Sequence, residues 1–492
     1  MTTASPALLW FRQDLRLQDN LALQAAVAHG GPVIPVYIFD EAGEGDWPVG
    51  GAARWWRHHA LESLAASLGE LGSRLVMARG DAGGILARLR RATGAGAVFW
   101  NRRYEPACVL QEAKIQAELS AQGVETRAFN GTLLFDPATV LNKQGRPFRV
   151  FTAFWRHGLS LPVPAPVRFK ARRLFAPARW PESLALADLG LKPNRGWADG
   201  WAREWQPGEE GARKRLKAFL AAEVDGYAAC RNIPAEKGTS QLSPWLHGGE
   251  LGVRQVWAAV RARGRPAGVF PASEGERVFL SELGWREFAH YLLHHFPHLP
   301  GAPLRPEFAR FPWAPDPGGK LLRGWQTGAT GYPIVDAGMR QLWRTGWMHN
   351  RVRMIAASFL VKHLRQPWAA GAAWFWDTLV DADLANNTLG WQWTAGCGAD
   401  AAPYFRVFSP VAQGERFDPQ GAYVRRWVPE LAGLPDEWIH RPWEAPTAIL
   451  HAAGVRWGET YPLPVVDHVT ARAEALAAFR QLRAAPAAAS DE

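Results

Sequence analysis

The stretch that decides the fold of this chain lies between residues 330 and 393. It reads TGYPIVDA at 330–337, GWMHNRVRM at 346–354, ASFLVKHL at 357–364, DADLANN at 381–387 and GWQW at 390–393. Arginines and aspartates recur there among apolar residues, next to amides and several tryptophans. An arginine and an aspartate that are buried together neutralise each other in a dry core. Such a stretch suits a helical core that holds an electron carrier rather than the site of a hydrolase.

Length and composition describe a globular protein with more than one domain. The chain has 492 residues, of which 48% are hydrophobic and 21% charged, and this length exceeds a single core. No apolar run reaches the roughly 18 to 20 residues of a membrane span, and no basic segment precedes an apolar stretch at the N-terminus. The thiols Cys108, Cys230 and Cys397 lie far apart, without metal-ligand spacing. We expect an intracellular, reduced protein with no structural metal and no membrane contact.

Charge and tryptophan content leave two alternatives open. A net charge of +10 permits binding to a polyanion, but excess arginine is also common in GC-rich bacterial proteins. The chain has 26 tryptophans against 8 tyrosines. Most of these indoles must pack the core, whereas a few in a line or facing a groove could relay electrons or stack on bases. Composition does not choose between these uses.

Residues 1–130 alternate strand and helix signals. Short apolar runs predict strands, and amphipathic stretches predict helices. The expected strands are 7–11, 32–39, 74–78, 97–100 and 125–129, and the expected helices are 21–29, 55–71, 82–91 and 108–122. This order predicts a doubly wound α/β domain with a parallel sheet. No Gly-x-Gly-x-x-Gly follows the first strand, so a Rossmann dinucleotide site is not expected.

The rest of the chain divides into a linker and a helical domain. Residues 131–208 are rich in proline and poor in periodicity, which predicts a long interdomain linker. Residues 209–483 show mainly helical periodicity and predict a larger all-α domain. Its expected helices are 212–224, 252–261, 274–296, 334–346, 349–364 and 371–379.

Two groups of polar residues are candidates for ligand binding. Residues 227–231 and 239–243 place hydroxyl groups before a helix, which suits a pyrophosphate; plain capping by Ser243 is the alternative. Glu282, Trp285 and Arg286 share one helix face and could read a flipped base pair by stacking, hydrogen bonding and a phosphate clamp. A surface ion pair beside a core tryptophan is the alternative there.

The expected helix 349–364 carries a third group. Asn350, Arg353 and Met354 fall on one side of it, with Arg351 displaced from them. We expect Arg353 to pair with Asp381 or Asp383 in a dry core, and such a pair beside an isoalloxazine could stabilise an anionic reduced flavin. His349 is expected to be an ordinary core or surface histidine.

With WFRQDLRLQDN at 10–20 and YFRVF at 404–408, these motifs resemble those of the photolyase/cryptochrome family, and the cyclobutane-dimer DNA photolyases most closely. The resemblance covers residues 7–480 and comprises long motifs in a fixed order. It implies an α/β antenna domain joined by a long linker to a helical FAD domain. This architecture agrees with the organisation predicted from periodicity.

The resemblance also implies roles for individual residues. The FAD phosphates and ribityl region would be held by Tyr227, Thr239, Ser240, Gln241, Leu242 and Ser243. The flavin end would meet Asp381, Ala382 and Asp383, with Arg353 nearby and Asn387 facing N5. The catalytic lesion pocket would be lined by Glu282, Trp285, Asn350, Met354 and Trp393. Electrons would pass from the surface through Trp313, Trp368 and Trp391. The DNA backbone would be met by Arg231, Arg286, Arg351, Arg406 and Gln413.

Single positions separate the branches of the family. Repair enzymes for (6-4) photoproducts are expected to have histidines where this chain has Asn350 and Met354, and neither of these donates a proton. Plant-type cryptochromes typically have Asp opposite N5 instead of Asn387, and they tend to lose the pocket tryptophan, here Trp285. Three dispersed cysteines exclude the iron–sulfur branch. The resemblance therefore implies a carbon–carbon lyase that repairs cyclobutane pyrimidine dimers with light and FADH⁻.

The implied partner is UV-damaged DNA containing pyrimidine dimers, bound by a monomer in the cytoplasm that associates with the nucleoid during repair. A cryptochrome-like photoreceptor that binds FAD and signals without repair is one alternative, and a nucleotide-binding α/β protein without a DNA role is another. Folate-binding relatives have an Asn-Glu pair where this chain has Ala107 and Cys108. This difference speaks against folate as a second antenna chromophore and leaves a deazaflavin, FMN or an empty site.

Overall fold

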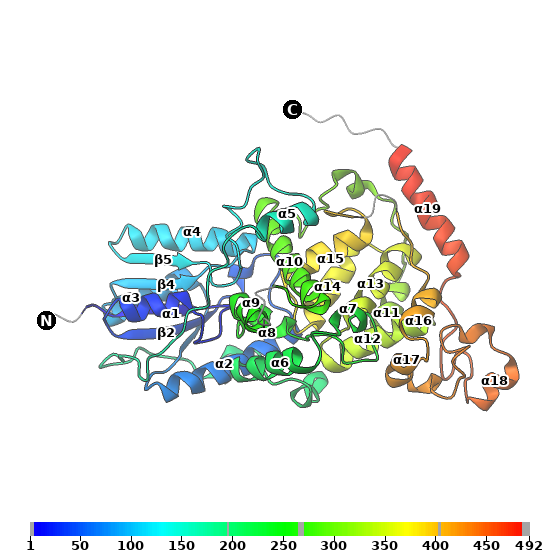
Figure 1. Ribbon diagram of the computed structural model, residues 1–492, viewed down its shortest axis with the longest axis horizontal. Helices are drawn as coiled ribbons and strands as arrows, with labels where there is room; N and C mark the ends of the chain where they lie inside the picture. The colour runs from blue at the N-terminus through cyan, green and yellow to red at the C-terminus, as the bar shows by residue number, and fades with distance from the viewer. Residues whose placement is uncertain (1–3, 194–195, 264–269, 402–404, 485–492) are drawn as a thin grey trace. The chain divides into compact units, whose positions relative to one another are not determined.

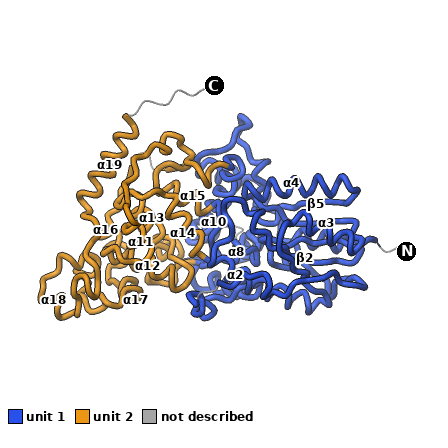
Figure 2. The backbone as a smooth tube through the Cα atoms, turned by 180° about the vertical axis from the view of Figure 1, so that it is seen from behind, with its two compact units in different colours: residues 1–225, 240–297, 380–385 blue, residues 226–239, 298–379, 386–492 orange. Residues whose placement is uncertain are grey.

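The computed structural model describes residues 4–193, 196–263, 270–401 and 405–484 (Figure 1). Within them the chain forms two compact units that do not follow chain order. The first unit comprises residues 1–225, 240–297 and 380–385, and the second comprises residues 226–239, 298–379 and 386–492 (Figure 2). Tyr404 of the YFRVF motif lies outside the described residues. The predicted domain boundaries at residues 130, 208 and 483 stay predictions.

The first unit is built on a five-stranded parallel sheet with the strand order β3-β2-β1-β4-β5. The strands are β1 (Ala7–Phe11), β2 (Val33–Phe39), β3 (Val76–Arg79), β4 (Ala97–Asn101) and β5 (Glu125–Phe129). Ala7 pairs with Val33 on one side and with Ala97 on the other. The strand order reverses at β1, so the prediction of a doubly wound α/β fold is confirmed.

Helices cover both faces of this sheet (Figure 1). They are α1 (Leu21–Ala28), α2 (Gly51–Glu70), α3 (Ala82–Thr93) and α4 (Pro106–Ser120). Leu8 and Trp10 of β1 pack in one cluster with Leu86 of α3 and Ile115 of α4. The alternate β1 residues point to the opposite face, and α1 contacts β1, β4 and β5 there. β1 and β2 are buried along their whole length, as expected for strands covered on both faces.

The segment 131–208 is not entirely irregular. It contains the helix α5 (Phe151–Gly158) and the 3-10 turns η2 (Leu186–Leu189), η3 (Gly196–Ala198) and η4 (Trp201–Arg203). α5 was not expected from the sequence, because eight residues give too short a window for helical periodicity. It is fixed by tertiary packing, since Phe151 and Phe154 are buried and α5 packs on α10.

The other helices of the first unit are α6 (Glu209–Ala222), α8 (Ser243–Gly248), α9 (Val253–Ala262) and α10 (Glu274–His295). The second unit contains α7 (Tyr227–Cys230), η5 (Pro306–Arg310), α11 (Lys320–Thr327), α12 (Pro333–Thr345), α13 (Asn350–Ser358), η6 (Phe359–His363), α14 (Trp368–Thr378), α16 (Pro410–Phe417), α17 (Ala422–Trp427), η7 (Pro429–Leu431), η8 (Pro442–Glu444), α18 (Thr447–Ala452) and α19 (His468–Ala484). α15 (Leu384–Ala395) belongs to the second unit from Asn386 onward. Over its described residues, the second unit holds a single β-bridge, between Trp457 and Tyr461, and no strand. The prediction of a helical second part is therefore confirmed. Along the described part of the chain, no helix is long and apolar enough to cross a membrane.

The predicted helix 349–364 is interrupted. α13 ends at Ser358, and Phe359–His363 forms a wider π-helical turn, η6. Lys362 in this turn is 5% exposed, and its ammonium donates a hydrogen bond to the Arg406 carbonyl and lies over the Phe405 ring. Such turns occur often at functional sites. Periodicity could not predict this one, because the partner residues follow some forty positions later.

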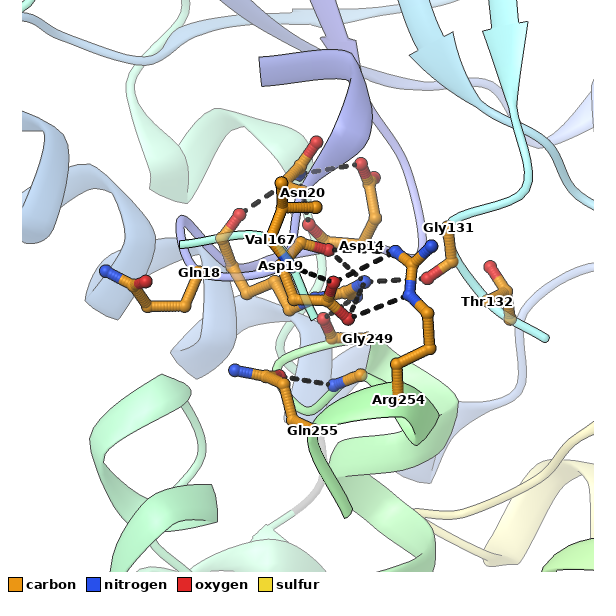
Figure 3. A network of polar contacts seen from close by, with 12 residues as sticks. Asp14, Gln18, Asp19, Asn20, Gly131, Thr132, Val167, Gly249, Arg254 and Gln255 are labelled. Carbon is orange, nitrogen blue, oxygen red and sulfur yellow. Dashed lines mark hydrogen bonds and ion pairs between the residues drawn. The ribbon is translucent and has the colours of Figure 1, made fainter. Parts of the chain in front are cut away.

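A buried polar network joins the sheet to the helices of the first unit (Figure 3). Asp19, in the turn after β1, adopts φ 55° and is 1% exposed. Its carboxylate lies 3.0 Å from Nη2 of Arg254 on α9 and accepts a hydrogen bond of 2.9 Å from the Val167 N–H. Arg16 donates to the carbonyls of Gly249 and Gly131, at 2.8 and 2.6 Å. One turn of chain therefore holds α8, α9 and the linker together.

Two amides complete this network at the end of the sheet. Asn20 caps α1 by accepting from the Leu23 N–H at 3.0 Å, and its amide donates to Asp14 at 3.1 Å. Asn101, the last residue of β4, donates to the same Asp14 oxygen at 2.6 Å. The DxxxxDN pattern of residues 14–20 is thus accounted for by the packing of the first unit.

Replacing Asp19 by Asn should strongly destabilise the first unit. Asn tolerates the left-handed backbone, but Arg254 and Arg16 lose the charge that offsets their burial. Breaking a buried pair in this way costs about 3–5 kcal/mol. Denaturant unfolding, followed by tryptophan fluorescence, should show an early transition displaced to lower denaturant.

The control is Glu274→Gln, which removes the exposed Glu274–Arg277 pair, with side chains 62% and 61% exposed. Its unfolding midpoint should match that of the unmodified protein. Equal midpoints for Asp19→Asn and the control would contradict the role of the network.

Candidate functional site

Two buried carboxylates precede α15 in the first unit. Asp381 accepts a hydrogen bond of 2.6 Å from the Ser243 hydroxyl at the start of α8. Asp383 lies 3.2 Å from Nε2 of His290 on α10 and 3.7 Å from Nδ1 of His247 on α8. Burial alone would raise the pKa of Asp383, but the two imidazoles outweigh it and hold that pKa well below its ordinary value. Asp383 is therefore a carboxylate in a nearly dry site.

The loop that enters α8 carries the predicted hydroxyl cluster. Gln241 adopts φ 51°, a conformation that costs free energy for a residue with a side chain and that clusters at ligand sites. The Ser240 carbonyl accepts from Nε of Arg215 at 2.7 Å, while Ser243 is exposed and Leu242 is buried. Thr239 and Tyr227 belong to the second unit. Within the first unit, the hydroxyls of Ser240 and Ser243, the backbone N–H groups at the start of α8 and the buried carboxylates form a donor and acceptor set that fits a nucleotide cofactor.

The candidates on α10 differ in how they are held. The Trp285 ring stacks on Phe151 of α5, with ring centroids 3.8 Å apart and an interplanar angle of 10°. Glu282, one turn earlier, is half-buried like Trp285. Arg286 is turned toward the linker: it donates to the Thr132 carbonyl at 3.1 Å, and its side chain is only 11% exposed.

Glu287 supports this part of α10 from inside. It accepts hydrogen bonds from the backbone N–H groups of Leu134 and Phe135, at 2.8 and 3.3 Å. Its burial raises its pKa to about 7. The linker is thereby attached to the helix that carries Glu282 and Trp285.

The second unit holds the candidates on α13. Asn350 is exposed and Met354 half-buried, whereas His349 is buried and caps the helix by accepting from the Arg351 N–H at 3.2 Å. Burial lowers the pKa of His349 to about 3, with a contribution from nearby arginines. His349 is thus a neutral structural residue. Arg353 donates to the Met348 carbonyl at 2.7 Å; its predicted pairing with Asp381 or Asp383 of the first unit stays a prediction.

Several of the predicted DNA-contacting residues lie in the second unit. Arg351 donates to Oδ1 of Asn232 at 2.8 Å and lies 4.5 Å over the Phe417 ring. Arg231 lies over the Tyr227 ring at 5.5 Å. Arg406 is exposed and lies over Phe408 at 5.1 Å. Gln413 is half-buried on α16.

The tryptophans proposed as a relay also lie in the second unit. Trp391 on α15 contacts the rings of Phe375 and Trp325 at 5.0 and 6.1 Å. Trp368 is buried at the start of α14, and Trp313 lies against Phe311 at 4.6 Å. Trp393 is half-buried. Asn387 donates to the Ala372 carbonyl at 3.0 Å, which ties α15 to α14 and orients its amide.

Sequence reasoning missed four residues that support these candidates: His247, His290, Phe151 and Trp325. His247 stands four residues after Ser243, so it lies on the same side of α8 and could have been noticed. His290 and Phe151 act through contacts with residues far along the chain, and no local pattern indicates them.

The α/β part of the first unit contains a second cluster of buried charge beside residues 107 and 108. Arg103 pairs with Glu44 at 2.7 Å and with Glu105 at 2.9 Å. The Cys108 thiol lies 3.8 Å from the Gly43 carbonyl, and burial raises its pKa far above the ordinary value. Cys108 is therefore an inert, packed thiol.

Comparison with known proteins agrees with this arrangement. Residues 7–168 match the family model described as DNA photolyase, and residues 279–481 match that of the FAD binding domain of DNA photolyase. The chain is 48% identical to a deoxyribodipyrimidine photo-lyase of Agrobacterium fabrum over 97% of this chain and 98% of that protein. It is 40% identical to cryptochrome-1 of Arabidopsis thaliana over 98% of this chain and 72% of that protein.

Solved structures give the same result. A bacterial class III photolyase from Agrobacterium tumefaciens superposes with a TM-score of 0.94 at 47% identity, covering 99% of both chains. A Synechocystis cryptochrome superposes with a TM-score of 0.88 at 28% identity, over 97% of this chain and 100% of that chain. The fold and the site define a light-dependent flavoprotein class, and the chain belongs to the photolyase/cryptochrome family.

The close packing of α14 against Trp391 gives a testable consequence. A Cβ added at Gly371 would lie 2.1 Å from the Trp391 ring, so Gly371→Ala must displace the indole. Overpacking of this kind costs about 1–3 kcal/mol. Thermal unfolding should show a lower midpoint, and the near-UV circular dichroism of the tryptophans should change.

Gly390→Ala on α15 is the matched control, because a Cβ there meets nothing within 4 Å. It should leave the near-UV spectrum unchanged and slightly raise stability, since Ala is the better helix former. A stabilising effect of both substitutions would contradict the packing described for Trp391.

Proposed function

We infer that the protein is a deoxyribodipyrimidine photolyase, which uses light and reduced FAD to repair cyclobutane pyrimidine dimers in DNA. The observation that carries this function is the stacking of Trp285 on Phe151, beside Glu282 on α10. An indole held flat from one side offers its other face to a flipped base. A protein that only senses light has no need of such a surface.

The residues around α8 and α15 fit FAD. Tyr227, Thr239 and residues 240–243 would hold its phosphates and ribityl chain, while Asp381, Ala382, Asp383, Arg353 and Asn387 would surround the flavin end. When bound, the reduced flavin supplies a photoexcited electron, and this chemistry belongs to the cofactor. The chain contributes position and charge: Ser243 fixes Asp381, and Asp383 supplies a fixed negative charge.

The lesion pocket would be formed by Glu282, Trp285, Asn350, Met354 and Trp393. Glu282 would hydrogen-bond the dimer and stabilise negative charge on it, an electrostatic effect that is strong in a dry pocket. Asn350 and Met354 have no titrating proton in the useful range, so this pocket lacks the general acid that a (6-4) lesion requires. The pocket is accordingly proposed for cyclobutane dimers.

UV-damaged DNA would be drawn in by the net charge of +10 and by Arg231, Arg286, Arg351, Arg406 and Gln413. Flipping the dimer costs a few kcal/mol, and least for a lesion that already distorts the duplex. Trp391, Trp368 and Trp313 would carry electrons to the flavin from the surface. We further propose a cytoplasmic monomer that associates with the nucleoid during repair, with a second chromophore other than folate.

A cryptochrome-like photoreceptor is the second candidate, because the chain is also 40% identical to cryptochrome-1 of Arabidopsis thaliana. Such a protein would bind FAD and respond to light without restoring damaged DNA. The stacked Trp285 and the side chain of Asn387 favour repair over this alternative.

Blue-light repair of an oligonucleotide with one thymine cyclobutane dimer tests the proposal directly. The reduced protein should restore the dimer in light and not in the dark, and it should leave a (6-4) photoproduct unchanged. Glu282→Ala should lower the yield while retaining FAD. FAD-loaded, reduced protein that leaves the dimer intact would instead support the photoreceptor.

Arg406→Gln tests the DNA surface. Each phosphate contact contributes about 0.9 to the slope of log K against log salt concentration. Binding of the variant to dimer-containing duplex should weaken at low salt, and the slope should fall by about 0.9. The control Arg456→Gln removes an exposed arginine that pairs with Glu459 and should keep the slope. Identical slopes for both variants would remove Arg406 from the DNA surface.

A further inference from the structure

His290 on α10 is enclosed by two hydrogen-bond acceptors. Its Nδ1 lies 3.0 Å from the Arg286 carbonyl oxygen, and its Nε2 lies 3.2 Å from Oδ2 of Asp383. The ring is 6% exposed and lies edge-on to Tyr104. A backbone carbonyl and a carboxylate only accept. As long as Asp383 is ionised, both ring nitrogens must therefore carry hydrogen, which makes the ring an imidazolium.

We propose that His290 is the cationic counter-ion that fixes the position and the charge of Asp383, and so tunes how the protein holds its flavin. The inference rests on the proposed function, since Asp383 is there a cofactor-binding residue. His290 is a positioning residue: it acts on the flavin through the Asp383 carboxylate. Beside an ionised Asp383, a neutral His290 could donate to only one of its two partners and would leave the other contact unfavourable.

The surrounding groups favour His290 over His247 as the cation. His247 lies farther from Asp383, at 3.7 Å, and its Nδ1 has no hydrogen-bond partner among the described atoms. Arg286 opposes a charge on His290, and Glu287 supports it. Glu105 is a further carboxylate near Asp383, and Arg103 pairs with it and lowers its pKa to about 2 despite its burial. Tyr104 stays a neutral phenol, since burial raises its pKa.

The sign of the pH dependence follows from these contacts. Burial would lower the pKa of His290, but Asp383 and the Arg286 carbonyl outweigh it and raise that pKa above the ordinary value. The ion pair is therefore complete at neutral pH and below, and it is lost as pH rises through the folded pKa of His290. The pKa of Asp383 is depressed, so the carboxylate side of the pair fails only in strong acid.

The alternative protonation state is a neutral His290 beside a protonated Asp383. It satisfies the same hydrogen bonds without charge. In this state His290 has no proton to lose at alkaline pH, so its titration would not increase the release of FAD there. The two states therefore differ in a measurable way that does not depend on DNA repair.

The experiment measures release of FAD from the loaded protein by flavin fluorescence, between about pH 6 and about pH 10, across the range where a raised histidine pKa lies. The unmodified protein should release FAD several-fold faster at the alkaline end, because the imidazolium that holds Asp383 is lost there. His290→Gln should release FAD about tenfold faster at neutral pH and show no alkaline step. His247→Gln is the matched control and should keep the step.

Two further measurements test the charge on His290. In the NMR spectrum of the unmodified protein, the His290 ring resonance is identified by its absence from the spectrum of His290→Gln. This resonance should titrate above the ordinary histidine pKa. Because the titration is measured on the unmodified protein, it is valid even where the variant is less stable. His290→Arg, which keeps the charge, should restore retention at high pH. An unmodified protein whose FAD release is independent of pH, or an alkaline step that persists in His290→Gln, overturns the inference. A protein that binds no FAD at all would instead overturn the proposed function.

Discussion

The buried ion pair between Asp19 and Arg254 is the constraint on which the first unit depends. Two charges that are nearly excluded from water must be matched by hydrogen bonds. Asp19, whose backbone is left-handed, obtains them from Arg254 and Val167. Arg16 adds the carbonyl of Gly249, directly after α8. Because α8 carries Ser243 and His247, the same turn determines where the groups around Asp381 and Asp383 lie.

Buried carboxylates recur in this chain, and their partners decide what each can do. Asp336 in the second unit accepts from the Thr330 hydroxyl at 2.7 Å and from the Tyr461 hydroxyl at 2.6 Å, and burial raises its pKa because these donors are neutral. Asp383 faces two imidazoles, and its pKa falls. The first arrangement fastens the TGYPIVDA motif to the C-terminal segment, whereas the second keeps a buried carboxylate charged.

The sequence predicted what depends on local pattern. Apolar runs located the five strands, with β1 and β5 at their observed bounds, and helical periodicity indicated the helical part. The sequence could not locate α5 or the π-helical turn at Phe359–His363, because both are set by contacts with distant residues. At the candidate site, residue types indicated Asp381 and Asp383, but their observed partners Ser243 and His290 stand far away in the chain.

The linker shows why this distinction matters for function. Local propensity treats residues 131–208 as a connector, yet Phe151 covers one face of Trp285 and Thr132 and Leu134 hold Arg286 and Glu287 of the same helix. An indole without that support would have rotamer freedom, and binding a base would have to restrict it. With one face already packed, Trp285 presents a preformed surface. The ring surface that Trp285 presents therefore depends on the linker as much as on the motif that carries the tryptophan.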